Sequence, residues 1–150
     1  MDKPTGLLRL SRVLFSAFAY PFNYGFIPRT LALDHDPLDI LVAGDAAQPL
    51  SLLTARPVGM LRMLDQGETD DKILAAPVHD PRWNEVHDLD GMAEHRLKEL
   101  HHFFTHYKEL EEKETLVTEW LGHDAACAEI QESLDRYSGR YAAGRHAFVS

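Results

Sequence analysis

The sequence predicts an α+β protein in which a small antiparallel β-barrel is flanked by two main helices. Up to about residue 80, short β-prone segments alternate with turns rich in glycine, proline and aspartate. Beyond that point, apolar residues recur at helical spacing in two stretches, over 91–111 and over 124–138. The chain has 150 residues, of which 45% are hydrophobic. This is enough for a single domain over residues 1–150 with one core.

The barrel strands are predicted from runs of β-branched and apolar residues that are bounded by turn signals. In order along the chain, the expected strands are Leu7–Leu10, Ile40–Val42, Leu50–Thr54, Val58–Met63 and Lys72–Ala76. Residues 65–72 contain a glycine and separate two such runs, so they are interpreted as the tip of a hairpin.

Two helices are predicted after the strands. The first covers Gly91–Glu111, with Asp90 as its N-cap, because apolar residues form one stripe along it. That stripe consists of Leu97, Leu100, Phe103, Phe104, Tyr107 and Leu110. The second helix covers Asp124–Ser138, with Gly139 as its stop signal. Residues 140–150 show no core pattern, and we expect them to form a mobile tail.

Asp34, Asp36 and Asp39 place three carboxylates in one short segment that also contains Pro37. Like charges about 4 Å apart repel by roughly 1 kcal/mol in water and by roughly 4 kcal/mol at an effective dielectric constant of about 20. Such a cluster therefore favours a bound cation, and its oxygen ligands suit Mg²⁺. Proline stiffens the segment as a loop. A solvated acidic turn is the alternative, while the spacing argues against a calcium-binding EF-hand loop.

A second acidic segment, residues 65–72, strengthens the interpretation as a cation site. Magnesium is usually held by one or two protein carboxylates, while waters and phosphate oxygens complete its shell. Two acidic segments that converge can hold several ions, and metals about 3.5–4 Å apart can activate a water and stabilise a leaving oxygen. Taken alone, this segment would be interpreted as a polar hairpin tip.

An aromatic segment upstream completes the pattern. Residues 20–28 offer the phenolic donors of Tyr20 and Tyr24, while Phe22 and Phe26 suit an aromatic core corner. The motifs are Tyr20-Pro-x-Asn23-Tyr24-Gly25-Phe-Ile-Pro28, Asp34-x-Asp36-Pro37-x-Asp39, Arg56-Pro57-Val58-Gly59 and His106-Tyr107-Lys108. In this order, from about residue 2 to about residue 137, the chain resembles the soluble magnesium-dependent inorganic pyrophosphatases of family I. The resemblance implies that the barrel is OB-like.

The resemblance also implies a chemistry, in which a metal-bound water attacks pyrophosphate directly and two orthophosphates are formed. Mg²⁺ is the implied cofactor, and pyrophosphate is expected to arrive as its magnesium complex. Asp36 matches the carboxylate that orients and deprotonates the water. The implied metal ligands are Asp34, Asp39, Asp70 and Asp65, and the implied phosphate-binding groups are Arg12, Tyr24, Lys72, Tyr107 and Lys108, with Tyr20 close by. This chemistry mainly requires that the water and the substrate are positioned and that the charge on the phosphate oxygens is neutralised.

The amino-terminal part of the sequence departs from the family. The family begins with strands that carry a glutamate and a phosphate-binding lysine, and this sequence shows neither before its first predicted strand. Ser11 stands where the family usually has an aspartate. We therefore expect a chain that lacks the amino-terminal strands, through a misplaced start at Met1 or a natural truncation. One alternative function is a catalytically weak homologue that acts as a metal-binding or assembly subunit. Another is a calcium-binding module.

The net charge and the cysteine content limit the possible binding partners and the cellular compartment of the protein. The net charge of −9 argues against nucleic acid and anionic membranes as partners. Cys127 is the single cysteine, which rules out an internal disulfide and suits a reducing cytoplasm. Residues 13–19 form an apolar run at the lower limit for a signal peptide. No run approaches the ~20 apolar residues of a membrane-spanning helix. The sequence therefore predicts a cytoplasmic protein.

Histidines on the first predicted helix allow two interpretations. His102 and His106 are four residues apart, a spacing that can chelate zinc on a helix. The simpler interpretation places them, together with His101, on the surface or at a subunit contact. In the resembling family, histidines at this place lie between the subunits of a hexamer. The resemblance therefore implies a homo-oligomer, and a hexamer in particular.

Overall fold

The computed structural model describes residues 4–5, 8, 10 and 12–142 of the chain. Within them, the strands are β1 (Asn23–Phe26), β2 (Asp39–Val42), β3 (Ala55–Asp65), β4 (Glu68–Thr69), β5 (Lys72–Pro77) and β6 (Thr115–Gly122). The helices are α1 (Glu94–His106) and α2 (His123–Ala142). Short 3₁₀ turns are η1 (Pro81–Trp83), η2 (Leu89–Gly91) and η3 (Glu109–Glu111). This combination of one sheet and two main helices confirms the predicted α+β class.

The described strands form one mixed sheet. Its order is β1-β2-β5-β3-β4, and β6 pairs with β3. Every pairing is antiparallel except that of β2 with β5, which is parallel. The sequence predicted an antiparallel barrel, and the parallel β2–β5 pair is the one pairing of the described strands that departs from it. Strands β3 and β4 lie between β2 and β5 in the sequence and provide the long connection that a parallel pair requires.

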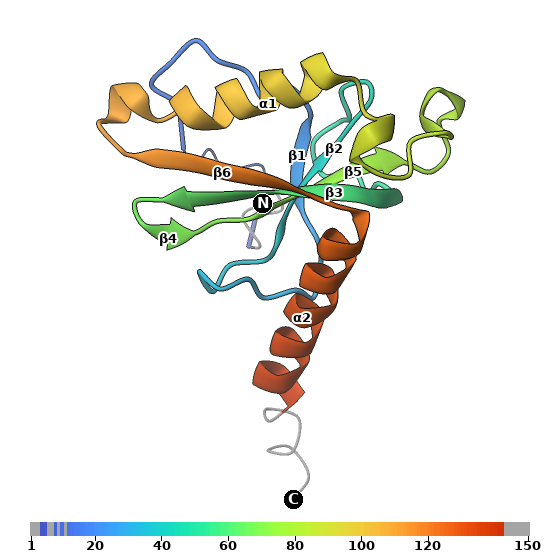
Figure 1. Ribbon diagram of the computed structural model, residues 1–150. Helices are drawn as coiled ribbons and strands as arrows, with labels where there is room; N and C mark the ends of the chain where they lie inside the picture. Colours follow the sequence, from blue (N-terminus) through green and yellow to red (C-terminus); the bar gives the residue numbers. More distant parts are fainter. Residues whose placement is uncertain (1–3, 6–7, 9, 11, 143–150) are drawn as a thin grey trace, which may run out of the picture.

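The two helices pack against different parts of the sheet. Helix α1 lies along β6, whereas α2 follows directly after β6, packs against β3 and extends away from the sheet (Figure 1). The larger core cluster joins the sheet to α1 and includes Leu61, Leu74 and Phe104. A smaller cluster includes Met60 of β3 and Ala126 of α2. Because successive side chains of a strand point to opposite faces, Met60 and Leu61 serve different clusters.

Three predicted strands are confirmed, because residues 40–42 lie in β2, 58–63 in β3 and 72–76 in β5. The predicted strand Leu50–Thr54 was wrong. This segment has no regular structure and exposes Leu50 and Leu52 to solvent. Apolar residues form a strand only where a neighbouring strand and a packed surface receive them.

Strands β1 and β6 are absent from the sequence prediction. Strand β1 lies inside the aromatic segment, where the prediction concerns only phenolic donors and core packing. Strand β6 alternates between half-buried and exposed residues over its first four positions. Its threonine, leucine, valine and tryptophan residues are typical of a half-buried strand, so its signal was present in the sequence.

Helix α1 is shorter than the predicted range Gly91–Glu111. It begins after Ala93, which makes no side-chain capping bond, so the predicted cap at Asp90 was wrong. Asp88 caps the preceding turn η2 instead, because its carboxylate accepts a hydrogen bond from the Leu89 amide. The apolar stripe begins inside the helix at Leu97 and continues beyond its C-terminal end, to Tyr107 and Leu110.

Helix α2 continues through Gly139, so the predicted stop was wrong. An interior glycine costs a helix only about 1 kcal/mol relative to alanine. Residues 140–142 of the predicted tail are helical, and residues 143–150 lie outside the described part of the chain. So do Ser11 and residues 7 and 9 of the predicted first strand, while Leu8 and Leu10 belong to no strand. Among the described helices, none has the length and apolarity to cross a membrane.

Candidate active site

The acidic loop of residues 34–39 is braced by its own backbone. Asp34 Oδ1 accepts a hydrogen bond from the Asp36 amide at 3.0 Å. The Asp36 carbonyl accepts another from the Ala32 amide at 2.8 Å. His35 adopts a φ of 73°, which is uncommon for a residue with a side chain and is found more often at functional sites. These hydrogen bonds give the loop a defined shape.

Residues flanking this loop anchor it to the fold. The buried hydroxyl of Thr30 accepts a hydrogen bond from the Leu38 amide at 2.9 Å. From α2, the Ser133 carbonyl accepts from the Leu31 amide at 3.0 Å. Arg136 Nε donates to the Leu31 carbonyl at 2.8 Å. Helix α2 therefore helps to position the loop that carries Asp34, Asp36 and Asp39.

Asp39, Lys72 and Asp70 form the buried centre of the site. Parallel pairing of β2 with β5 puts Asp39 and Lys72 at the same register position, and Lys72 Nζ lies 2.6 Å from Asp39 Oδ2. The same ammonium donates to Asp70, which follows β4. From the adjacent strand β1, Tyr24 donates its hydroxyl hydrogen to Asp39 Oδ2 at 2.5 Å. The Lys72 side chain is only 3% exposed, so its charge depends on these partners.

The pKa values of these groups follow from burial and neighbouring charge. Burial alone lowers the pKa of Lys72, but the carboxylates of Asp39 and Asp70 outweigh it, so the pKa is raised above its ordinary value. Burial and then the charge of Asp39 raise the pKa of Tyr24. Burial is also the main cause that raises the pKa of Tyr107. At neutral pH the lysine is therefore charged, and both phenols are protonated hydrogen-bond donors.

Lys108 forms an ion pair with the second acidic segment, residues 65–72. Its side chain is 6% exposed and forms an ion pair with Asp65, the last residue of β3. Lys108 follows Tyr107, the C-cap of α1. Thr115 pairs with Asp65 in the sheet, and its hydroxyl donates to the Phe104 carbonyl at 2.8 Å. The end of α1 is thereby fixed beside the end of β3, and this brings Lys108 to Asp65.

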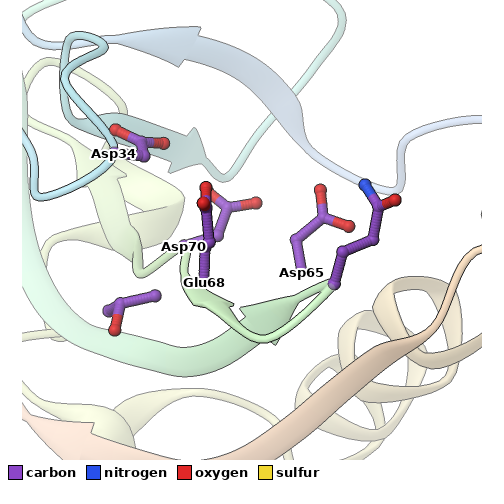
Figure 2. Close-up of a pocket in the computed structure, with 6 residues that line it drawn as sticks. Asp34, Asp65, Glu68 and Asp70 are labelled. Atoms are coloured by element: carbon purple, nitrogen blue, oxygen red, sulfur yellow. The ribbon is translucent and has the colours of Figure 1, made fainter.

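A pocket of about 310 Å³ lies where the two acidic segments meet. Asp34 reaches it from the loop before β2, while Asp65, Glu68 and Asp70 come from the hairpin around β4 (Figure 2). Gln66 and Thr69 complete the lining. Carboxylates that are distant in the sequence therefore share one cavity.

The donor set of this pocket fits a hard divalent cation. Its charged groups are all carboxylates, and Mg²⁺ needs only one or two of them when waters and phosphate oxygens fill its other positions. Asp65 Oδ1 is buried and has no hydrogen-bond partner among the described residues, although such oxygens are normally paired. In the described part of the chain, no three His, Cys, Asp or Glu side chains form a ready ligand cage. Asp39 and Asp70 pair with Lys72 instead.

Arg12 and Tyr20 connect the segment before β1 to this centre. Tyr20 stacks on Tyr24 with ring centroids 4.6 Å apart, and burial raises the pKa of its hydroxyl. The guanidinium carbon of Arg12 lies 6.0 Å from the Tyr107 ring centroid. Arg12 also donates to both carboxylate oxygens of Glu111, at 2.9 and 3.0 Å. Two aromatic contacts thus tie this segment to the site.

The structure places most of the predicted site residues together. Asp34, Asp65 and Asp70 line the pocket, and Asp39, Lys72 and Tyr24 form the bonded centre beside it. Arg12, Tyr20, Tyr107 and Lys108 lie around them through ring contacts and the Asp65 ion pair. Asp36 is exposed and is not among the lining residues, although its amide bonds to Asp34.

The sequence prediction missed two acidic residues of this region. Glu68 lines the pocket, and its place in the second acidic segment was a usable signal. Glu111 binds Arg12 across 99 residues of sequence, and no local pattern could have paired the two.

The histidines of α1 form no metal site in the described residues. The ring centroids of His102 and His106 lie 4.4 Å apart. His106 Nδ1 lies 2.8 Å from the His102 carbonyl oxygen. No third histidine, cysteine or acid joins them within the part of the chain that the structure describes. The zinc interpretation therefore has no support.

The raised pKa of Tyr107 should make the unfolding free energy depend on pH in the alkaline range. Tyr107 is 4% exposed, and its pKa in the fold is raised. In the unfolded chain a phenol loses its proton near pH 10, so above that pH the unfolded state binds fewer protons and stability falls. Each such group contributes a slope of about 1.4 kcal/mol per pH unit. Tyr107→Phe should therefore show a shallower fall of unfolding free energy above about pH 10.

Urea denaturation at stepped pH measures this slope. Below about pH 9, where phenols are protonated in both states, the variant and the wild type should show parallel pH dependence. Identical slopes above pH 10 would contradict the raised pKa of Tyr107.

A carboxylate-lined pocket beside buried lysines and protonated phenols is the arrangement of a metal-dependent hydrolase of phosphate anhydrides. Residues 1–138 match the family model described as inorganic pyrophosphatase. The chain belongs to the inorganic pyrophosphatase family, whose family I members depend on metal ions.

Individual relatives agree in sequence and in fold. Soluble inorganic pyrophosphatase 2 of Chlamydomonas reinhardtii is 43% identical over 142 residues, which are 94% of this chain and 74% of the relative. Soluble inorganic pyrophosphatase 1 of Arabidopsis thaliana is 45% identical over 139 residues, 92% of this chain and 66% of the relative. The inorganic pyrophosphatase structure from Helicobacter pylori matches with a TM-score of 0.86 at 39% identity, covering 92% of this chain and 84% of that one. The OB-like α+β fold is confirmed by this similarity.

Proposed function

We propose that this chain hydrolyses inorganic pyrophosphate to two orthophosphates, with Mg²⁺ as cofactor and with the substrate arriving as its magnesium complex. The observation that carries the proposal is the pocket of Asp34, Asp65 and Asp70 beside two buried lysines, Lys72 and Lys108. Carboxylate oxygens suit the cation, and ammonium groups suit the phosphate oxygens. The net charge of −9 is compatible with an anionic substrate once the metal charge is included.

We assign the metal-holding role to Asp34, Asp39, Asp65 and Asp70. Asp34, Asp65 and Asp70 line the pocket, and Asp39 shares Lys72 with Asp70. Asp65 Oδ1 has no hydrogen-bond partner among the described residues, and this supports the assignment because a cation would satisfy it. When bound, Mg²⁺ neutralises phosphate oxygens and lowers the pKa of a coordinated water toward about 7.

Lysines, phenols and Arg12 are assigned to the binding and orientation of the phosphate groups. Lys72 and Lys108 are held by carboxylates, so little reorganisation is needed when charge develops on the substrate. The raised pKa values keep Tyr24 and Tyr107 protonated, and each can donate a hydrogen bond without adding charge. Arg12 adds the planar set of donors that suits phosphate oxygens.

Asp36 is assigned to the proton transfer. Its side chain is exposed beside the pocket residue Asp34, and an ionised carboxylate only accepts protons and hydrogen bonds. The water oxygen forms a new bond to one phosphorus while one water proton passes to an Asp36 carboxylate oxygen. The bond from that phosphorus to the bridging oxygen breaks, and the bridging oxygen leaves with the second orthophosphate.

We also propose a cytoplasmic homo-oligomer, a hexamer by its family resemblance, with no nucleic-acid or membrane partner. The single cysteine and the names of the soluble relatives support this location. The alternative of a catalytically weak metal-binding or assembly subunit has less support, because the relatives that match over more than nine-tenths of the chain are named as enzymes.

Phosphate release from pyrophosphate tests the proposed function. The purified chain should release phosphate in proportion to added Mg²⁺, and removal of the metal with a chelator should stop the release, because the pocket acids alone cannot neutralise the substrate. Restoring Mg²⁺ should restore the rate. Binding of Ca²⁺ without any hydrolysis in Mg²⁺ would instead favour the calcium-binding alternative.

A further inference from the structure

Arg12 depends on a side-chain partner for its position. It lies before β1 in a segment without regular secondary structure, and an arginine side chain carries about 2 kcal/mol of rotamer entropy that ordering removes. A phosphate-binding arginine at such a place needs a contact that keeps its guanidinium near the substrate. Glu111 makes this contact, because both of its carboxylate oxygens accept hydrogen bonds from Arg12 Nη2 at 2.9 and 3.0 Å.

Glu111 is itself firmly placed. It is the last residue of η3, and its amide donates to the Lys108 carbonyl at 2.9 Å. Its side chain is only 6% exposed, and Lys113 Nζ lies 3.1 Å from its Oε2. The hydrogen bond from Arg12 is the main cause that holds the pKa of Glu111 below its ordinary value. Glu111 is therefore a covered, ionised anchor on the turn that follows Lys108.

This anchor puts Arg12 beside two other groups that we assign to phosphate binding. The Arg12 guanidinium carbon lies 6.0 Å from the Tyr107 ring centroid, and Lys108 Nζ lies 5.2 Å from the same centroid. Within the described residues, Nη2 alone bonds to Glu111. A guanidinium has five N–H donors, so Nε and Nη1 keep donors with which an anion can be bound.

We propose that Glu111 is a positioning residue that holds the Arg12 guanidinium beside Tyr107 and Lys108, where the three groups bind one phosphate group. This inference rests on the proposed function. Without the carboxylate, Arg12 would move in solvent, and ordering it would become part of the cost of binding. The loss should therefore appear in affinity rather than in turnover.

Glu111→Gln keeps the size of the side chain and removes its charge. The Mg²⁺-loaded variant should bind inorganic phosphate about fivefold more weakly by calorimetry and show a KM for pyrophosphate about fivefold higher, with kcat within about twofold of the wild type. Glu111→Asp should recover part of the affinity, because it keeps the charge. Glu99→Gln is the matched control. Glu99 pairs with Arg96 at 3.0 Å on α1, and this variant should match the wild type in all three quantities.

The Arg12→Ala background shows whether Glu111 acts through Arg12. Adding Glu111→Gln to Arg12→Ala should cause no further loss of phosphate affinity, as expected for two residues in one interaction. An equal loss in both backgrounds overturns the inference, as does wild-type affinity in Glu111→Gln, whether or not its melting temperature falls. Phosphate binding involves no turnover. An inactive wild type would therefore count against the proposed function, while the affinity comparison would still decide the role of Glu111.

Discussion

Replacing Asp36 by asparagine should lower the turnover of pyrophosphate about a thousandfold, within the 10²–10⁴ range of general acid–base catalysis. Asparagine has nearly the same shape as aspartate, but its amide cannot accept the proton of the attacking water. Asp36 is exposed, and its hydrogen bonds with Asp34 and Ala32 are made by its backbone amide and carbonyl. The fold and the affinity for Mg²⁺ should therefore change little.

Steady-state phosphate release and the Mg²⁺ dependence of the melting temperature measure these two expectations. Asp135→Asn is a matched control, because Asp135 is an exposed aspartate on α2 whose side chain accepts a hydrogen bond from Gln131. Its turnover should equal that of the wild type. An unaltered rate in Asp36→Asn would show that Asp36 does not accept the proton of the attacking water. A large decrease in the melting temperature of Asp36→Asn would indicate a structural role for Asp36 instead.

Replacing Lys72 by methionine should destabilise the metal-free protein by about 3 kcal/mol, the lower end for a broken buried ion pair. Lys72 is almost fully buried and contacts the carboxylates of Asp39 and Asp70, which are themselves mostly covered. Without the ammonium, the two negative charges would face each other with no counter-charge. Mg²⁺ should recover part of the lost stability, because a cation that binds only the folded state stabilises it by mass action.

Urea denaturation with and without Mg²⁺ measures both effects. Lys98→Met serves as the control, because Lys98 is an exposed lysine that pairs with Glu94 on α1 and exposed pairs contribute at most about 1 kcal/mol. This control should lose little stability in either buffer. A loss in Lys72→Met that Mg²⁺ leaves unchanged would argue that these acids do not hold the cation.

Local features of the site could be predicted from the sequence. The hairpin around residues 65–72 follows from a glycine turn between two apolar runs, and the structure pairs β3 with β4 at that point. The loop before β2 follows from Pro37 and the neighbouring aspartates. In both cases residue types within a few positions determine the backbone, so distant parts of the chain are not needed.

Other elements escaped the prediction because their outcome depends on packing. Leu50 and Leu52 have strand-like character, yet none of the described strands pairs with their segment, and both side chains are exposed. Gly139 resembles a helix stop, but α2 continues through it, since a helix already packed on β3 tolerates the small cost of one glycine. Strand β6 carried a usable β signal, but only its pairing with β3 explains why Lys108 lies beside Asp65.

Residue identity and spacing alone determined the family, the acidic and basic groups that it uses and the two segments that carry most of the acids. The tertiary structure decided which charges meet. Parallel pairing of β2 with β5 brought Lys72 between Asp39 and Asp70, and the packing of the turn after α1 brought Glu111 to Arg12. Ion pairs act over a few ångströms in space, whereas sequence patterns describe neighbours along the chain, so only the fold could place these partners together.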